Sequence, residues 1–198
     1  MIETPDGLRA LYDQPGERAV RKQLAAIDRH CERFLGLSPF VVIASADAQG
    51  HMDASPRGGP PGFVRVVDAR TLLLPDASGN NRLDTLTNLT ATRRVGLLFL
   101  IPGVDESLRI NGSAALSSEP ALLQRFADQS RPPKLVLVVT VEEVYLHCAK
   151  ALMRARLWDP NSRVERSQVP TLGQMLSDQT GCPTETQEAM LARYAREL

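Results

Sequence analysis

Between residues 40 and 146 the sequence repeats one pattern: a short apolar run rich in β-branched residues, then a few turn-forming residues. Such runs predict β-strands, and short turns between them predict hairpins. The seven expected strands cover 40–46, 51–58, 63–67, 71–74, 95–101, 106–114 and 135–146. Consecutive hairpins favour an antiparallel, barrel-like sheet over a parallel α/β fold. Closing a barrel removes sheet edges, which explains how so many β-branched strands stay soluble.

Helices are expected at both ends of this mainly β chain. Residues 17–35 predict one amphipathic helix, because apolar residues recur at spacings of three and four. Its apolar face consists of Val20, Leu24, Ile27, Cys31 and Phe34. A length of 198 residues allows one sizeable core. We therefore expect one domain over 1–160 and a helical extension over 161–198 that packs on the same domain.

Composition argues against several classes of protein. The chain carries 23 basic and 23 acidic residues, which disfavours a nucleic-acid or anionic-membrane surface. Its longest apolar runs, 95–101 and 135–141, are too short to span a bilayer, and no secretory signal is visible. Cys31, Cys148 and Cys182 are widely scattered, so we expect no disulfide framework and no metal site. A cytoplasmic location fits this pattern.

The strand from 51 onward ends in Ser55-Pro56-Arg57-Gly58, followed by Gly59-Pro60-Pro61-Gly62. Proline has no amide donor, so this segment cannot continue as a central strand. It can present a hydroxyl, a guanidinium and glycine amides at a strand end, which suits a bound phosphate. The alternative is an ordinary loop with a solvated arginine.

Three further patches lie near strand ends or turns. In the first, Asn80 or Asn81 would cap a helix over 83–89, whose free amides together with Arg82 favour an anion. The second is Arg109 with Asn111, and the third comprises His147, Lys150, Arg156 and Trp158. Taken alone, each patch is a weak signal and is better explained by a capped helix, a solvated face or a packing tryptophan. Together, these cations and amides suit one anionic, planar ligand.

The order of the segments carries more information than any single patch. The ordered segments are 40–46, Asp53–Gly58, Leu72–Asp76, Gly79–Leu86, Val95–Gly103, Leu108–Gly112 and Tyr145–Ala151. In this order the chain resembles the pyridoxamine 5′-phosphate oxidase-like, FMN-binding split-barrel family, over about residues 35–160. More narrowly, it resembles an uncharacterised branch with Ser-Pro-Arg-Gly and Gly-Asn-Asn-Arg signatures.

The resemblance implies a six-stranded antiparallel split β-barrel that forms a homodimer, with two FMN sites at the subunit interface. It places Ser55, Pro56 and Arg57 along the flavin and its phosphate, and Pro75 and Asp76 at the border of the ring. Asn80, Asn81 and Arg82 would hold phosphate and ribityl groups, and Arg109 and Asn111 would reach the same cofactor. His147, Lys150, Arg156 and Trp158 would come from the partner subunit or close the pocket.

The resulting hypothesis is an FMN-dependent oxidoreductase that moves a hydride between N5 of the flavin and a small organic substrate. Two alternatives stay open: a flavin-binding storage or sensing module without turnover, and a barrel that binds haem, deazaflavin or nucleic acid. Residues 156–160 only approximate the tryptophan-and-arginine tail of true pyridoxamine phosphate oxidases. The resemblance therefore leaves the substrate open.

Overall fold

The computed structural model describes residues 1–77 and 79–197; Ser78, within the loop expected over 75–82, lies outside the described residues. The chain divides into two compact units, Met1–Ala155 and Arg156–Leu198. The boundary lies a few residues before the expected one at 160. That the second unit packs on the first stays a prediction.

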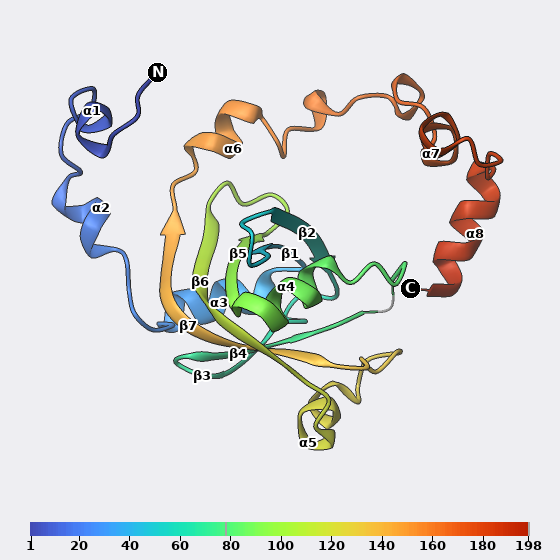
Figure 1. Cartoon of the computed structure of the whole chain (residues 1–198), viewed down its shortest axis with the longest axis horizontal. Coiled ribbons are helices and arrows are strands. Elements are labelled where there is room, and N and C mark those ends of the chain that lie inside the picture. Colours follow the sequence, from blue (N-terminus) through green and yellow to red (C-terminus); the bar gives the residue numbers. More distant parts are fainter. Residues whose placement is uncertain (78, 198) are drawn as a thin grey trace. The chain divides into compact units, whose positions relative to one another are not determined.

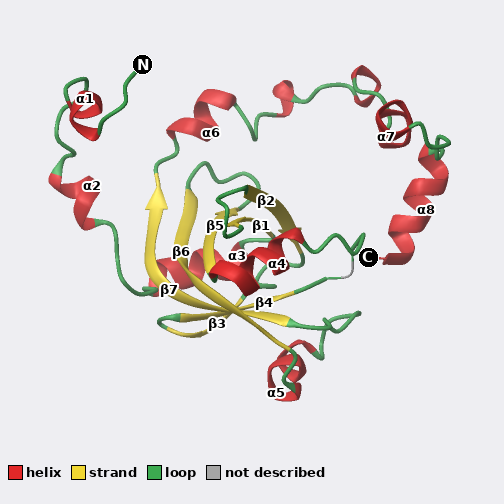
Figure 2. Cartoon of the chain, in the orientation of Figure 1, coloured by secondary structure: helices red, strands yellow, loops and turns green. Residues whose placement is uncertain are grey.

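The first unit is built on one antiparallel sheet, in the order β2-β1-β5-β6-β7-β4-β3 (Figures 1 and 2). Its strands are β1 (Phe40–Ala46), β2 (Met52–Gly58), β3 (Arg65–Asp68), β4 (Thr71–Pro75), β5 (Arg94–Leu100), β6 (Ser107–Ser117) and β7 (Val136–His147). The prediction of a mainly β, antiparallel fold with added helices is confirmed. The six strands implied by the resemblance are wrong, because the sheet has seven, as the apolar runs indicate. The short β3 is part of the sheet: it pairs with β4 after a tight turn, and its Val66 packs against the core.

The strands β2 and β3 form the two edges of the sheet. Pro56 lies within β2, directly opposite Val42 of β1. A proline removes one ladder hydrogen bond, so an edge strand is the place that tolerates it. The expectation that this segment is not a central strand is therefore correct, although the strand itself runs on to Gly58.

The core lies on one face of the curved sheet, here called the inner face. Strand residues such as Val41, Ile43, Leu97 and Ile110 are fully or almost fully buried there. They form one cluster with residues of α3 (Arg29–Leu37) and α4 (Asp84–Thr92). The two helices contribute Cys31, Phe34, Leu35, Leu86 and Leu89. A second, smaller cluster joins Phe126 and α5 (Pro120–Leu123) to Leu73 and Val136.

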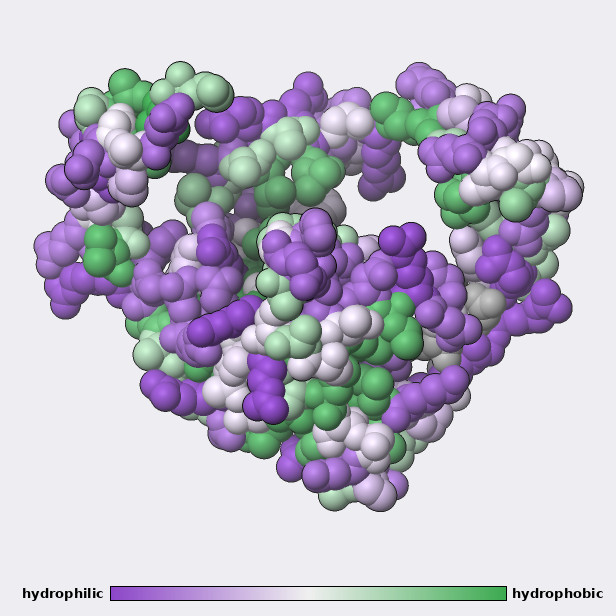
Figure 3. All heavy atoms as spheres, viewed as in Figure 1, coloured by the Kyte–Doolittle hydropathy of each residue, from purple (hydrophilic) through white to green (hydrophobic). Residues whose placement is uncertain are grey.

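The opposite, outer face of the sheet is less covered. We read 95–101 as a strand buried on both faces, because it is apolar throughout, and this is wrong. Val95, Leu97 and Phe99 are buried, but Leu98 of β5 points the other way and is 37% exposed. Figure 3 views the molecule from the side of α4, which packs on the inner face, and shows hydrophobic side chains among hydrophilic ones below that helix.

The single helix expected over 17–35 is also wrong. The structure has α2 (Glu17–Arg21), an extended stretch, and then α3. In the stretch between them, the backbone of Leu24 exchanges two hydrogen bonds of 2.9 Å with Val144 of β7. The N–H of Ile27 donates to the carbonyl of Ala69 at 2.7 Å. The backbone groups that would close helical turns are thus used by the sheet.

The remaining helices of the first unit are α1 (Pro5–Arg9), the 3₁₀ turn Gln124–Phe126 and α6 (Lys150–Ala155). The second unit consists of two 3₁₀ turns, Pro160–Ser162 and Arg166–Gln168, followed by α7 (Leu172–Thr180) and α8 (Gln187–Glu197). Across the described residues, every helix is too short or too polar to cross a bilayer.

Candidate functional site

The edge strand β2 carries three polar side chains on the inner side of the sheet. Directly opposite residues of an antiparallel pair share a face. Asp53, Ser55 and Arg57 lie opposite the buried residues Ser45, Ile43 and Val41 of β1. The side chains of β2 alternate between half-buried and exposed, and these three are the half-buried ones. The guanidinium of Arg57 donates to the hydroxyl of Ser55 and, at 3.0 Å, to the carbonyl of Pro56.

The helix α4 is attached to this strand by polar contacts. The hydroxyl of Thr85, near the start of α4, donates to the carboxylate of Asp53. Farther along the helix, the buried amide of Asn88 donates to the hydroxyl of Ser45 at 3.1 Å. These contacts fix the N-terminal end of α4 beside the half-buried side of β2.

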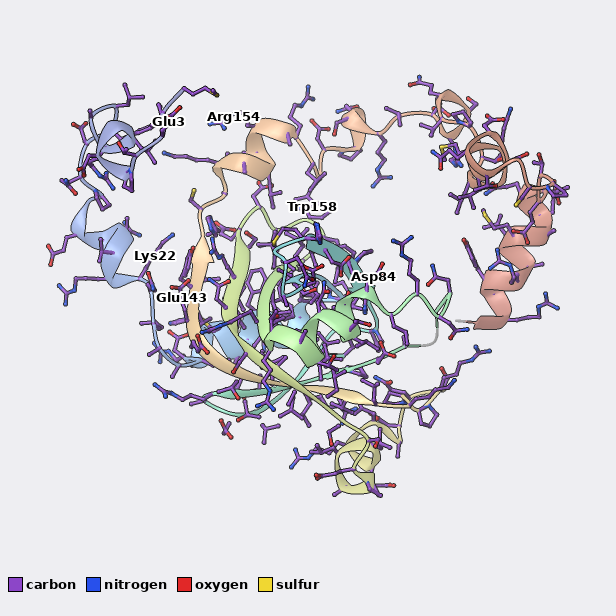
Figure 4. The ribbon with its side chains drawn as sticks, in the orientation of Figure 1. Glu3, Lys22, Asp84, Glu143, Arg154 and Trp158 are labelled. Atoms are coloured by element: carbon purple, nitrogen blue, oxygen red, sulfur yellow. The ribbon has the colours of Figure 1, made fainter. Side chains whose placement is uncertain are left out.

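The Gly-Asn-Asn-Arg segment precedes α4, but neither asparagine caps it. The N-cap residue is Leu83, so the expected cap by Asn80 or Asn81 is wrong. The carboxamide oxygen of Asn80 instead accepts the backbone N–H of Arg82 at 2.9 Å, and Asn81 has a left-handed φ of 59°. Arg82 forms an ion pair with Asp84, which Figure 4 labels at the start of α4. The hydrogen bond between Arg82 and Asp84, together with the charges of Asp84 and Asp53, holds the pKa of Arg82 above its usual value.

An acid from the end of β4 completes this group. Pro75 is buried as the last residue of β4, and Asp76 follows it half-buried. Burial raises the pKa of the Asp76 carboxyl, and the positive charges of Arg57 and Lys134 oppose this shift. We call Ser55, Arg57, Asp76 and Arg82, with the connecting Asp53, the β2-edge group.

The other predicted residues of the sheet lie on its outer face. Arg109 lies opposite Tyr145, and Asn111 lies opposite Glu143. The amide of Asn111 donates to the carboxylate of Glu143 at 2.7 Å. His147, the last residue of β7, is half-buried and contacts the Tyr145 ring with a centroid distance of 5.2 Å. In one chain, these residues therefore belong to the opposite face of the sheet from the β2-edge group.

The remaining predicted residues are Pro56 and Lys150 in the first unit and Arg156 and Trp158 in the second. Pro56 points to the outer side of β2 and is exposed. Lys150 is the exposed first residue of α6. Arg156 and Trp158 belong to the second unit, where Arg156 forms an ion pair with Asp159. Their role at a shared ligand stays a prediction.

Sequence reasoning missed several residues that the structure adds. Asp53 connects β2 to α4, and its place two residues before Ser55 put it on the same side of the strand, which was a usable signal. Lys134 is far from Asp76 in sequence and gave no signal. Lys22 reaches the end of β7, where its ammonium donates to the carbonyl of Leu146 at 2.9 Å. Because one helix was expected over 17–35, nothing in the sequence indicated that Lys22 contacts β7.

Comparison with known proteins decides the family. The sequence model described as pyridoxamine 5′-phosphate oxidase matches residues 27–148, more than half of the chain. The chain belongs to this family. No curated protein matches the sequence. The match contains every strand of the sheet and both groups of residues on it.

Of two similar solved structures, one supports the same fold. HupZ from Group A Streptococcus is 18% identical, with a TM-score of 0.51; the match covers 61% of this chain and 93% of that chain. An FMN-binding protein from Syntrophomonas wolfei subsp. wolfei is 14% identical, with a TM-score of 0.47, over 59% of this chain and 84% of that chain. At these identities the first comparison shows a shared fold only.

Proposed function

We propose that this member of the pyridoxamine 5′-phosphate oxidase family is an FMN-dependent oxidoreductase that acts on a small organic substrate. The observation that carries the proposal is the β2-edge group. There, the Ser55 hydroxyl and the Arg57 guanidinium lie together on one edge strand, and Arg82 lies within the electrostatic influence of Asp53 of the same strand. A dianionic phosphate is best bound by such guanidinium and hydroxyl donors.

The chemistry of this donor set fits the phosphorylated end of FMN. Only Nη1 of Arg57 is used in the two hydrogen bonds to Ser55 and Pro56, and a guanidinium has five N–H donors. Arg82 is largely exposed, and its ion pair with Asp84 is a surface pair of modest strength that a phosphate can replace. The carboxylate of Asp53 accepts the hydroxyl of Thr85 in α4, and the structure shows no hydrogen bond from it to Arg57 among the described residues.

When bound, FMN supplies hydride transfer at N5. In our proposal Ser55, Arg57 and Arg82 bind the phosphate, Asn80 and Asn81 bind the ribityl chain, and Pro75 borders the ring. Asp76 is the one titratable acid of the group with a raised pKa, which suits it to hold or release a proton near the ring. Arg109, Asn111 and His147 reach the cofactor from a partner subunit, so the proposed protein is a homodimer. The free thiols of Cys31, Cys148 and Cys182 fit the cytoplasm.

The first test is an absorbance spectrum of the purified protein, with mass identification of any molecule that copurifies. We expect the flavin bands of FMN. A colourless protein that ignores added FMN, or one that copurifies with haem, would contradict the proposal. Stopped-flow mixing with NADH or NADPH then tests turnover. Bleaching of the flavin supports an enzyme, and no bleaching with either donor supports a storage or sensing module.

Arg57→Ala tests the phosphate position directly. Loss of a charge-assisted hydrogen bond costs about 1.5–3 kcal/mol, so FMN affinity should fall by about tenfold or more. Flavin fluorescence titration measures this change. Arg125→Ala, which removes an exposed arginine outside the β2-edge group, is the matched control. Equal affinities of both variants would refute the position assigned to Arg57.

A further inference from the structure

Two cations lie near one aromatic ring at the C-terminal end of β7. The ammonium of Lys22 lies 5.2 Å from the centroid of the Tyr145 ring, and the guanidinium carbon of Arg109 lies 5.5 Å from it. His147 contacts the same ring. We call Lys22, Arg109, Tyr145 and His147 the Tyr145 cluster. Each cation gains from the ring, but a ring does not neutralise a charge.

Lys22 is distant in sequence from the other residues of the cluster, and the fold brings it to them. Leu24 pairs with Val144 along the margin of β7 that β4 leaves unpaired, because β4 pairs only with Val136–Thr140. Lys22 then bonds the carbonyl of Leu146 and is held beside the end of the strand. Figure 4 shows Lys22 and Glu143 close to β7.

The two cations of the cluster lack the ion pairs that other arginines of the sheet form within the described residues. Other arginines on the sheet have carboxylate partners, as in Arg94 with Glu142 and Arg65 with Asp128. Among residues 1–77 and 79–196, no carboxylate forms an ion pair with Lys22 or Arg109. The nearby Glu143 is instead bonded by the neutral amides of Asn111 and Gln23.

The pKa of His147 is sensitive to both cations. Burial lowers the pKa of its imidazole, and the charges of Lys22 and Arg109 lower it further. The imidazole is therefore neutral at neutral pH and still offers an N–H donor. A bound anion would add negative charge beside both cations and complete the hydrogen bonding of the cluster.

We propose that the Tyr145 cluster binds a compact oxyanion, a carboxylate or a phosphate group, through Lys22, Arg109 and His147. The site itself rests on this geometry. Its assignment to an acidic group of the substrate rests on the function proposed above. The substrate class is then a small organic acid or a phosphate ester. Lys22 distinguishes this site from the proposed flavin-binding set, because Arg109 and His147 are assigned to both and Lys22 only to the oxyanion.

The test uses the full-length protein as purified, titrated with inorganic phosphate and, separately, with acetate at constant ionic strength. Backbone NMR shifts of Tyr145 and His147 should change saturably with at least one anion. In Lys22→Ala the affinity should fall by about tenfold, as expected when one charge-assisted hydrogen bond is lost. Arg21→Ala, which removes the neighbouring exposed arginine paired with Glu17, is the control and should bind like the wild type. Tighter binding of phosphate indicates a phosphate ester, and tighter binding of acetate indicates a carboxylate.

Two results would overturn the site: no saturable shift with either anion, or an equal loss in Lys22→Ala and Arg21→Ala. FMN affinity, measured by fluorescence, should be unchanged in Lys22→Ala. A loss of FMN affinity there would show that Lys22 also holds the cofactor and would overturn the assignment of its oxyanion to the substrate. A wild type that binds anions at the cluster but never binds FMN would refute the proposed function alone.

Discussion

At the scale of single residues, His147 gives the clearest pH dependence. Because burial, then Lys22 and Arg109, lower its pKa, an NMR titration of its ring protons should have a midpoint below the usual 6.5. Lys22→Ala removes one cation, so the midpoint should rise. The resonance of His30, on the N-terminal turn of α3, should not change between the two proteins. A midpoint of 6.5 or higher in the wild type would contradict the charge distribution described here.

The same shift links His147 to stability. Between its lowered pKa and 6.5 the folded state binds fewer protons than the unfolded state, so stability rises with pH through this window. The stability that the neutral imidazole of His147 contributes is fully present above pH 6.5 and is lost as pH falls toward the pKa of the folded state. Urea unfolding above and below the window should show this slope. His147→Gln, which cannot titrate, should flatten it.

Gly112 is a second residue whose identity the fold requires. It follows the register shift between Asn111 and Gly112, where Glu142 becomes the extra residue of β7. A Cβ at Gly112 would lie 2.0 Å from the carbonyl oxygen of Thr140. Gly112→Ala should therefore destabilise the protein by about 1–3 kcal/mol, as overpacking does.

The matched control is Gly36→Ala, because a Cβ at this helical glycine of α3 meets nothing within 4 Å. It should be neutral or stabilise the protein by up to about 1 kcal/mol. Urea unfolding midpoints compare both variants with the wild type. Similar midpoints for Gly112→Ala and Gly36→Ala would show that the bulge accommodates a methyl group.

At the scale of elements, the start of α3 depends on Asp28. Its carboxylate accepts the N–H groups of His30 and Cys31, at 3.0 and 2.8 Å, and the bond from Cys31 is the main cause of its lowered pKa. Asp28→Ala should cost about 1 kcal/mol of stability, the usual value of an N-cap. The stabilisation is present above the unfolded pKa of 3.8 and is lost as pH falls through the folded pKa.

Asp28→Asn tests the same contact without its charge. Asparagine caps helices about as well as aspartate, so this variant should be nearly as stable as the wild type at neutral pH. Its stability should lose the acid dependence that Asp28 contributes. If Asp28→Ala and the wild type unfold at the same urea concentration, the cap does not stabilise α3.

The same element shows what sequence periodicity can and cannot reveal. Ile27, Cys31 and Phe34 were expected on the apolar face and are buried. The residues between α2 and α3 were expected to be helical and are extended, because their hydrogen bonds go to Val144 and Ala69. Local patterns carry no information on such distant partners. The contact of Lys22 with β7 could therefore not be predicted from the sequence.

At the scale of the whole molecule, the sequence indicated the antiparallel sheet and the residues of the β2-edge group. It could not show that Arg109 and Asn111 face away from that group within one chain. The face of each residue depends on strand register, and the bulge after Asn111 shifts that register locally. If both sets bind one flavin, as proposed, a second copy of the chain must supply one of them.

The outer face of the sheet suits such a second copy. Strand register places Pro56, Val42, Leu98, Arg109 and Tyr145 in one row across five strands. The row is apolar from β2 to β5 and cationic or aromatic on β6 and β7. We therefore expect the wild type to sediment as a dimer, because association would bury Leu98 and its neighbours.

Leu98→Glu should convert the protein to a monomer without unfolding it, because Leu98 is 37% exposed in the single chain. FMN affinity should fall in parallel, since a monomer lacks the residues that the partner supplies. Val67→Glu, at a position 39% exposed in the edge strand β3, is the control and should remain dimeric. Sedimentation velocity measures the oligomeric state, circular dichroism the folding, and flavin fluorescence the FMN affinity. A Leu98→Glu monomer that binds FMN as tightly as the wild type would show that one chain holds the flavin alone, and would refute the contact of Arg109 and Asn111 with the cofactor.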